Sequence, residues 1–318
     1  MRRFPVRYVA HRLLLAVGVL WAAFTVSFVV LYLLPGDPVA TMAAGGLDAE
    51  PVSPQELDAL RARYGLDQPI VVQYLHRLGA AVTGDFGTSI QNGQDVRSAV
   101  ADALPSTLQM AFAGLGFAIV FGGAVALVAT YTRARWLRQV LLALPSLAVS
   151  LPVFWVGLML VQIFSFSLGL LPSVGAAGPR SLVLPAATLG LSTGALVAQV
   201  LAKSMSQALD QPYVTTARAK GAGNVAVHLR HALPNAAVPA LTVLGYVVGN
   251  LLAGSVVVET VFTRPGLGRL TVTAVGTQDI PMVQGIVVFA ALVFVLVNLL
   301  VDLAYPLLDP RIVTGARV

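Results

Sequence analysis

Long apolar runs separated by short polar segments dominate this chain. A window of about 19 residues finds six runs, each near the roughly 20 residues that a helix needs to cross the hydrocarbon core of a bilayer. The predicted spans are Val9–Leu34, Thr107–Tyr131, Leu137–Phe166, Leu182–Ala202, Val238–Phe262 and Val283–Leu307. The pattern therefore predicts an all-α, polytopic membrane protein with six transmembrane helices.

The first of these runs has the basic flank of a signal peptide, with Arg2, Arg3 and Arg7 ahead of it. Its apolar part, from Leu13 to Leu34, is longer than a usual signal-peptide core, and no convincing small-residue cleavage site follows it directly. We interpret it as a membrane anchor.

Composition supports the membrane assignment. Of the 318 residues, 57% are hydrophobic and only 11% are charged, whereas a soluble surface needs roughly a quarter to a third of charged positions. A net charge of +6 could indicate a nucleic-acid partner, but the basic residues are scattered between apolar runs rather than gathered on one face. The chain has no cysteine, which excludes disulfides and thiolate metal sites.

Charge also predicts the orientation, because cytoplasmic loops carry an excess of Lys and Arg. With a cytoplasmic N-terminus, the inside segments hold Arg2, Arg3, Arg7, Arg12, Arg133, Arg135, Arg138, Lys203, Arg218, Lys220, Arg230, Arg311 and Arg317. Most acidic residues fall in the long segment after the first span. We expect both termini in the cytoplasm, residues 1–34 as N-terminus and first helix, 35–104 as a small external subdomain, and 105–318 as a membrane core of five helices with a short cytoplasmic C-terminus.

Two short helices are predicted in the external subdomain. The first is Ser53–Tyr64, in which Ser53 caps the N-terminus, with Pro54 at the first helical position and Glu56 completing a capping box. The second is Pro69–Val82, and Gly84–Asp102 reads as loop. Nothing in this segment resembles a catalytic constellation.

A basic, polar insert, Tyr213–Pro239, separates two of the apolar runs and lies largely within the loop 209–235. Its pattern predicts a helix, a stop at Gly221 and a second helix whose apolar face is Val225, Leu229 and Leu233, ending at Pro234. A connecting loop need only be short and soluble, so we interpret this one as a docking element.

Polar groups within the spans could line a polar path. We select Gln162, Gln199, Asn250 and Glu259, although the amides could equally bond across helices, and Glu259, close to a predicted span end, fits a structural ion pair or cap better than such a path. The small residues of the fourth span, such as Gly190 and Gly194, predict burial between helices. We expect no metal site: His228 and His231 are spaced i, i+3, but they lie beside the docking helix, which favours a structural role.

The insert resembles the EAA motif of ABC importer permeases, E-A-A-x-x-x-G-x9-I-x-L-P. Ala217, Gly221, Leu233 and Pro234 match it, whereas Thr215, Thr216 and His231 replace the Glu, the first Ala and the Ile. Permeases of the dipeptide, oligopeptide and nickel importers, with Y-x-x-x-A-R-A-K-G and R-H-A-L-x-N-A, are more similar. The matching residues here are Tyr213, Ala217, Arg218, Ala219, Lys220, Gly221, Arg230, His231, Ala232, Leu233 and Asn235.

The resemblance extends over nearly the whole chain, from about Val9 to Arg311. The stretch Leu34–Pro38 matches the L-P-G-D-P of the first of the two permeases in such systems, and Gly65–Pro69 matches its G-L-D-x-P. Towards the C-terminus, Glu259–Gly268 is similar to E-x-x-F-x-x-P-G-L-G and Asp302–Arg311 to D-x-x-Y-x-x-x-D-P-R.

The resemblance implies one half of a transporter. A second, homologous permease subunit would complete the path through the bilayer, two ABC ATPase subunits would drive it, and an extracytoplasmic substrate-binding protein would deliver cargo. ATP and Mg would bind the partner ATPases and no cofactor this chain, which has no G-x-x-x-x-G-K-[ST] loop. The location implied is the inner membrane of a prokaryote, and di- or oligopeptides are the expected cargo by frequency in the family.

The same resemblance implies ATPase coupling through Tyr213, Thr215, Thr216, Ala217, Arg218, Ala219, Lys220, Gly221, Arg230, Leu233 and Pro234. We expect small Ala217 and Ala219 to permit close approach, and Arg218 and Lys220 to meet acidic or carbonyl groups of the ATPase. The competing reading is that these cations only satisfy the positive-inside rule.

Two other classes of function, a secondary transporter and a membrane enzyme, fit the sequence less well. A secondary transporter driven by an ion gradient would also be polytopic, but it predicts paired broken helices with inward-facing charges near mid-membrane, and the sequence has none. A membrane enzyme would need a cluster of His, Asp or Ser at one depth. We expect no catalytic residue in this chain.

Overall fold

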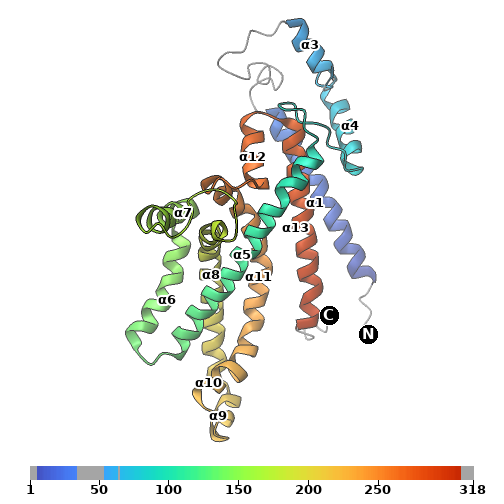
Figure 1. The fold of residues 1–318 in the computed structure, drawn as a ribbon. Coiled ribbons are helices and arrows are strands. Elements are labelled where there is room, and N and C mark those ends of the chain that lie inside the picture. Colours follow the sequence, from blue (N-terminus) through green and yellow to red (C-terminus); the bar gives the residue numbers. More distant parts are fainter. Residues whose placement is uncertain (1–5, 34–53, 64, 309–318) are drawn as a thin grey trace. The chain divides into compact units, whose positions relative to one another are not determined.

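The computed structural model describes residues 6–33, 54–63 and 65–308 (Figure 1). Their regular structure is helical, apart from one isolated bridge between Thr88 and Asp95. In chain order the elements are α1 (Val6–Leu33), α3 (Pro54–Arg63), α4 (Ile70–Val82), α5 (Val96–Tyr131), α6 (Arg135–Ser150), α7 (Val153–Leu160), π-helix η1 (Val161–Ser167), α8 (Arg180–Leu209), α9 (Pro212–Ala219), α10 (Asn224–Ala226), π-helix η2 (Val227–Ala232), α11 (Leu233–Val261), α12 (Leu267–Gly276) and α13 (Ile280–Leu308).

The all-α class is confirmed, but the count of six spans is not. In the described part of the chain four helices are long and apolar enough to cross a membrane: His11–Leu31 within α1, all of α5, all of α8, and Ile280–Val297 within α13. The number is five if a bent helix pair is counted as one span, and the apolar part of α11, Gly249–Val261, is shorter.

The bent pair corrects the third predicted span, Leu137–Phe166. The chain forms α6, breaks at Leu151–Pro152 and continues as α7 and η1, with an angle of 107° between Arg135–Ser150 and Val153–Ser167. Leu151 is extended, with φ −86° and ψ 133°, because a residue before proline is disfavoured in the helical region. Pro152 also lacks the N–H that would continue the helix.

The chain forms two compact units. The first contains the described residues of Met1–Pro105 and Gly266–Leu299, and the second those of Ser106–Pro265 together with the end of α13. The core of the first unit brings residues of α1, the start of α5, α12 and α13 together, among them Leu31, Val96, Leu267 and Ile280.

A buried carboxylate organises the loop 84–95 of the first unit. Asp279, which precedes α13, is 3% exposed; its oxygens accept hydrogen bonds from the Ser89 hydroxyl, from the Ile90 amide (3.2 Å) and from the Met282 amide (3.3 Å). The carboxylate therefore caps α13 and holds the loop against it.

The predicted loop Gly84–Asp102 is too long, because α5 begins at Val96. Asp95 caps this helix: its Oδ1 accepts the Ser98 amide at 2.8 Å. The two shorter helices, α3 and α4, occur where the sequence predicts them, although Ser53 lies outside the described residues.

In the second unit, α5 and α8 approach each other at the level of their backbones. A Cβ on Gly122 would lie 2.4 Å from the carbonyl oxygen of Gly194, and one on Gly190 would lie 2.6 Å from that of Gly114. Gly190, Gly194 and Ala195 of α8 are buried. The expected burial of the small-residue span between helices is confirmed.

Candidate functional site

The docking insert folds as two helical segments joined by a tight turn. Pro212 occupies the start of α9, where its missing N–H costs nothing, and Lys220 is the C-cap residue that follows the helix. Gly221 has φ +85°, which favours glycine. The amide of Gly221 bonds the Arg218 carbonyl at 2.9 Å, and that of Ala222 bonds the Ala217 carbonyl at 3.1 Å. These two bonds are a Schellman motif, so the predicted helix stop at Gly221 is present.

One face of α9 is buried against the chain and the rest is exposed. Val214 (1% exposed) and Ala217 (9%) point inward. The small side chain of Ala217 therefore permits close approach of α9 to the rest of this chain. The exposed residues of the segment are Tyr213, Thr215, Thr216, Arg218, Ala219, Lys220 and Gly221.

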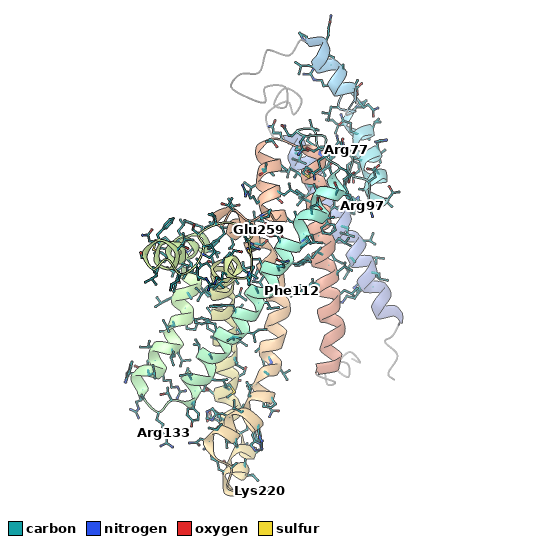
Figure 2. All side chains as sticks on the ribbon, in the orientation of Figure 1. Arg77, Arg97, Phe112, Arg133, Lys220 and Glu259 are labelled. Atoms are coloured by element: carbon teal, nitrogen blue, oxygen red, sulfur yellow. The ribbon has the colours of Figure 1, made fainter. Side chains whose placement is uncertain are left out.

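Cations concentrate on the exposed face, and Lys220 lies at the tip of the loop (Figure 2). Within the described residues, neither Arg218 nor Lys220 has an ion-pair or side-chain hydrogen-bond partner. Arg218 is in the last turn of α9, where the helix dipole favours a positive charge. Arg230 is also exposed, on η2.

Side-chain contacts tie α9 to the following helix. The Asn235 amide on α11 donates to the Tyr213 hydroxyl at 3.4 Å and to the His231 carbonyl at 2.9 Å. Segments α10, η2 and α11 follow one another without a gap, so no break occurs at Leu233–Pro234. Half-buried Leu233 begins α11, and exposed Pro234 lies in its first turn, where proline is tolerated.

The predicted apolar face of the second segment is wrong. Val225 is 58% exposed and Leu229 47%, whereas the buried side chains are those of Val227, His228 and Ala232. Residues Val227–Ala232 form a π-helix, in which the buried positions Val227 and Ala232 are five residues apart, wider than the 3.6-residue period on which the expectation was based.

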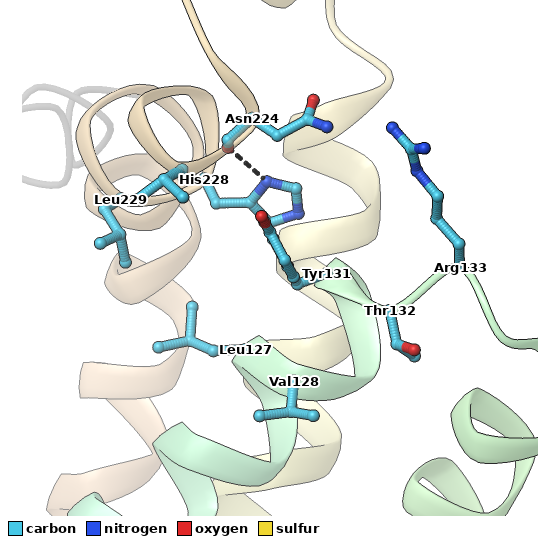
Figure 3. Close-up of a pocket in the computed structure, with 9 residues that line it drawn as sticks. Leu127, Val128, Tyr131, Thr132, Arg133, Asn224, His228 and Leu229 are labelled. Carbon is cyan, nitrogen blue, oxygen red and sulfur yellow. Dashed lines mark hydrogen bonds between the residues drawn. The ribbon is translucent and has the colours of Figure 1, made fainter.

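An apolar cavity of about 600 Å³ lies between the end of α5 and the start of this second segment (Figure 3). Leu127, Val128 and Tyr131 line it from α5, and Val225 and Leu229 from the other side. Sequence reasoning missed this cavity, since only the fold brings residues a hundred positions apart together.

His228 closes the wall of the same cavity. Its Nδ1 is 2.9 Å from the Asn224 carbonyl oxygen and its Nε2 is 3.3 Å from that of Thr130 at the end of α5, while its ring meets Tyr131 edge-on (Figure 3). A helix leaves its last carbonyls without partners, so His228 serves α5 as a cap. In the described part of the chain no three His, Asp or Glu side chains converge as a metal site.

The four path candidates do not come together. Gln162 and Asn250 are exposed, on η1 and α11, and Gln199 on α8 donates a hydrogen bond to Ser146 at 3.3 Å. Glu259 is fully buried and accepts a hydrogen bond from the Thr107 hydroxyl at 2.6 Å. None of the four lines the apolar cavity between α5 and the second helical segment.

A buried arginine, Arg264, follows Glu259 by five residues in the sequence. Arg264, 2% exposed and beyond the end of α11, donates to the carbonyl oxygens of Gly175 (3.4 Å) and Ser181 (3.3 Å). Burial lowers the pKa of Arg264, and the charge of Glu259 acts in the opposite direction. The arginine therefore fastens the turn before α8 to the end of α11.

The comparison with known proteins agrees with this geometry. Residues 118–314 match the family described as "Binding-protein-dependent transport system inner membrane component", and residues 5–111 match its N-terminal companion family. Glutathione transport system permease proteins GsiC are similar along almost their whole length: that of Escherichia coli K12 is 37% identical and that of Salmonella typhi 38%, each over 96% of this chain and 98% of the relative.

Solved structures show the same fold. An inward-facing structure of the MetNI methionine ABC transporter has a TM-score of 0.55 at 16% identity, covering 66% of this chain and 96% of the other. A second crystal form gives 0.53 at 20% identity with the same coverage. With the matching family residues and the multi-pass helical architecture, these likenesses show that the chain belongs to the inner membrane components of binding-protein-dependent transport systems, the permease subunits of ABC importers.

Proposed function

We propose that this chain is the first permease subunit of a peptide importer and forms the translocation path with a second, homologous permease. The family works with ATPase and binding-protein partners; we further infer two ATPase subunits and one extracytoplasmic binding protein. The cargo proposal rests on the relatives, whose name specifies glutathione, a tripeptide. ATP and Mg would bind the ATPases, and this chain would carry no cofactor.

The orientation we propose has both termini in the cytoplasm. It is supported by the cations at and near the insert, Arg218, Lys220 and Arg230, and by those at the α5–α6 turn, Arg133 and Arg135. This places α9 on the ATPase side and the loop 84–95 outside.

The observation that supports the coupling proposal is that one face of α9 is buried against its own chain, whereas the other face is exposed and carries cations. Val214 and Ala217 fix the helix to its own chain, so Thr215, Arg218 and Lys220 are presented outward. Two cations without partners on a fixed helix are suited to carboxylates or carbonyl groups of an ATPase subunit.

The insert is also built to transmit displacement. The Schellman bonds close α9 tightly, the Asn235–Tyr213 bond joins it to α11, and His228 joins η2 to the end of α5. When the ATPases close on ATP, movement of α9 would thus reach α5 and α11 together. Closure shifts the transporter towards its outward-open form only if that form binds the closed ATPases better.

For the path itself we propose Gln162, Gln199 and Asn250, whose amides are accessible. Glu259 is a weaker path candidate, because its carboxylate is fully buried and accepts a hydrogen bond from Thr107 in this conformation. Its position fits a role in holding α5 to α11.

Reversing the charge of Arg218 tests whether this residue couples the chain to an ATPase or only satisfies the positive-inside rule. We expect Arg218→Glu to reduce uptake and binding-protein-stimulated ATP hydrolysis at least tenfold in the transporter reconstituted with all its subunits, corresponding to about 1.4 kcal/mol or more. The matched control is Arg138→Glu, an exposed cation on α6 with the same change of charge.

The control should insert and transport as the unchanged protein does. Equal behaviour of the two variants would count against coupling through α9. A separate arm offers the binding protein a dipeptide, a longer peptide, a nickel chelate or a glycoside; stimulation by a non-peptide cargo alone would refute the peptide assignment and leave the coupling assignment intact.

A further inference from the structure

Helix α4 has an apolar stripe that the rest of the described chain does not cover. Val71, Leu75 and Val82 follow one another at i, i+4 and i+11 and are 68%, 61% and 82% exposed. Half-buried Leu78 completes the row at i+7. Such a row is one face of a helix. The preceding helix, α3, has the polar sequence PQELDALRAR and no comparable stripe.

Two contacts fix the level of α4 along the spans of the first unit. The Tyr74 hydroxyl is 2.9 Å from the Thr25 hydroxyl on α1, and the Tyr74 ring packs on Phe24 and Phe28. On the other side, the Arg77 guanidinium donates to Gln284 on α13 at 3.3 Å (Figure 2 labels Arg77).

Both contacts lie inside membrane-crossing segments. Thr25 lies within the α1 span His11–Leu31, six residues before Leu31, about 9 Å at 1.5 Å per residue. Gln284 follows the start of the α13 span at Ile280 by four residues, about 6 Å. Leu31 and Ile280 belong to one buried core, so these span ends are on the same side of the membrane.

Side chains of α4 thus contact α1 and α13 about 6–9 Å along the spans from Leu31 and Ile280, which matches the depth of an interfacial amphipathic helix, whose apolar face is buried roughly 5–10 Å. The polar residues of α4 fit this position. Arg77 reaches back towards Gln284, and Tyr74 is of the type enriched at membrane interfaces. Val26, Val29 and Val30 of α1, at the same level, are also exposed and apolar.

We propose that α4 lies in the bilayer interface at the C-terminal end of α1, with Val71, Leu75 and Val82 in contact with lipid. The sequence predicts this helix within an external subdomain, and the contacts with α1 and α13 bring it to the membrane surface. In the orientation proposed above the leaflet is the outer one. The inference rests on α1 and α13 crossing the membrane and is independent of the cargo and of coupling through α9.

The absence of cysteine from the chain allows a direct test. Spin labels are attached to single cysteines in the full-length chain, reconstituted with its co-purifying subunits in vesicles of phosphatidylethanolamine and phosphatidylglycerol. Test positions are Val71→Cys and Leu75→Cys. The lipid control is Val26→Cys on α1, which is 61% exposed, and the water control is Ala59→Cys on α3, also exposed.

Collision of the label with oxygen, which concentrates in lipid, is compared with collision with a water-soluble nickel chelate. We expect an oxygen-to-nickel ratio at Val71 and Leu75 several-fold above that at Ala59 and close to that at Val26. A ratio equal to that of Ala59 would place α4 in water, and low accessibility to both reagents would place it under another protein subunit; either result overturns the proposal.

Discussion

At the scale of the single residue, Gly221 shows how a backbone conformation constrains the coupling loop. Its φ of +85° allows the chain to reverse after α9, and two backbone bonds depend on that reversal. Gly223, two positions later, has φ −68° and ψ 162°, which any residue can adopt. No heavy atom lies within 4 Å of a Cβ built at either glycine, so only conformation distinguishes them.

This contrast gives a matched pair of variants. We expect Gly221→Val to destabilise the loop by about 1–2 kcal/mol, because a β-branched residue resists the left-handed region, and to lower uptake per ATP hydrolysed. Gly223→Val should change stability by less than about 0.5 kcal/mol. Thermal unfolding and the ratio of uptake to hydrolysis measure both effects; similar results for the two variants would contradict the assigned role of the turn.

At the scale of the element, α5 and α8 pack closely because glycines at their contact let the two backbones approach each other. Gly122 faces the Gly194 carbonyl, where a Cβ would lie at 2.4 Å, whereas its neighbour Gly123 faces open space. Membrane helices gain little from burying apolar surface away from lipid, so close backbone packing carries their association.

The neighbouring glycines should therefore respond to alanine with opposite signs. Gly122→Ala forces two helices apart and should destabilise the protein by about 1–3 kcal/mol. Gly123→Ala should be neutral or stabilise by up to about 1 kcal/mol, since alanine favours helix. Thermal unfolding in detergent compares them, and equal midpoints would show that this packing does not hold α5 and α8 in the native protein.

At the scale of the whole molecule, the proposed orientation places α9 and the loop 84–95 on opposite sides of the membrane. Single cysteines at exposed Gln94 and Lys220 report on it, since the natural chain has none. In intact spheroplasts a membrane-impermeant maleimide should label Gln94→Cys, and Lys220→Cys only after permeabilisation. Labelling of Lys220→Cys in intact spheroplasts would reverse the topology and remove α9 from the reach of cytoplasmic ATPases.

The local pattern of the sequence was sufficient for several features of this protein. Apolar runs of about 20 residues require a membrane, because such surface cannot face water. The helix α9 and its stop at Gly221 also follow from local chemistry, since capping and left-handed turns depend on neighbouring residues. Family motifs spread over the chain identified an ABC importer permease, and the comparisons confirm this.

Only the tertiary structure decided how distant segments meet. The 107° bend within the third predicted span, the exposure of Val225 and Leu229, and the burial of Glu259 against Thr107 were not predicted. Hydropathy sums apolar character along a run and is insensitive to a change of direction within it. A residue's partner depends on segments far away in sequence, and a π-helix changes which face a position occupies, so these features required the fold itself.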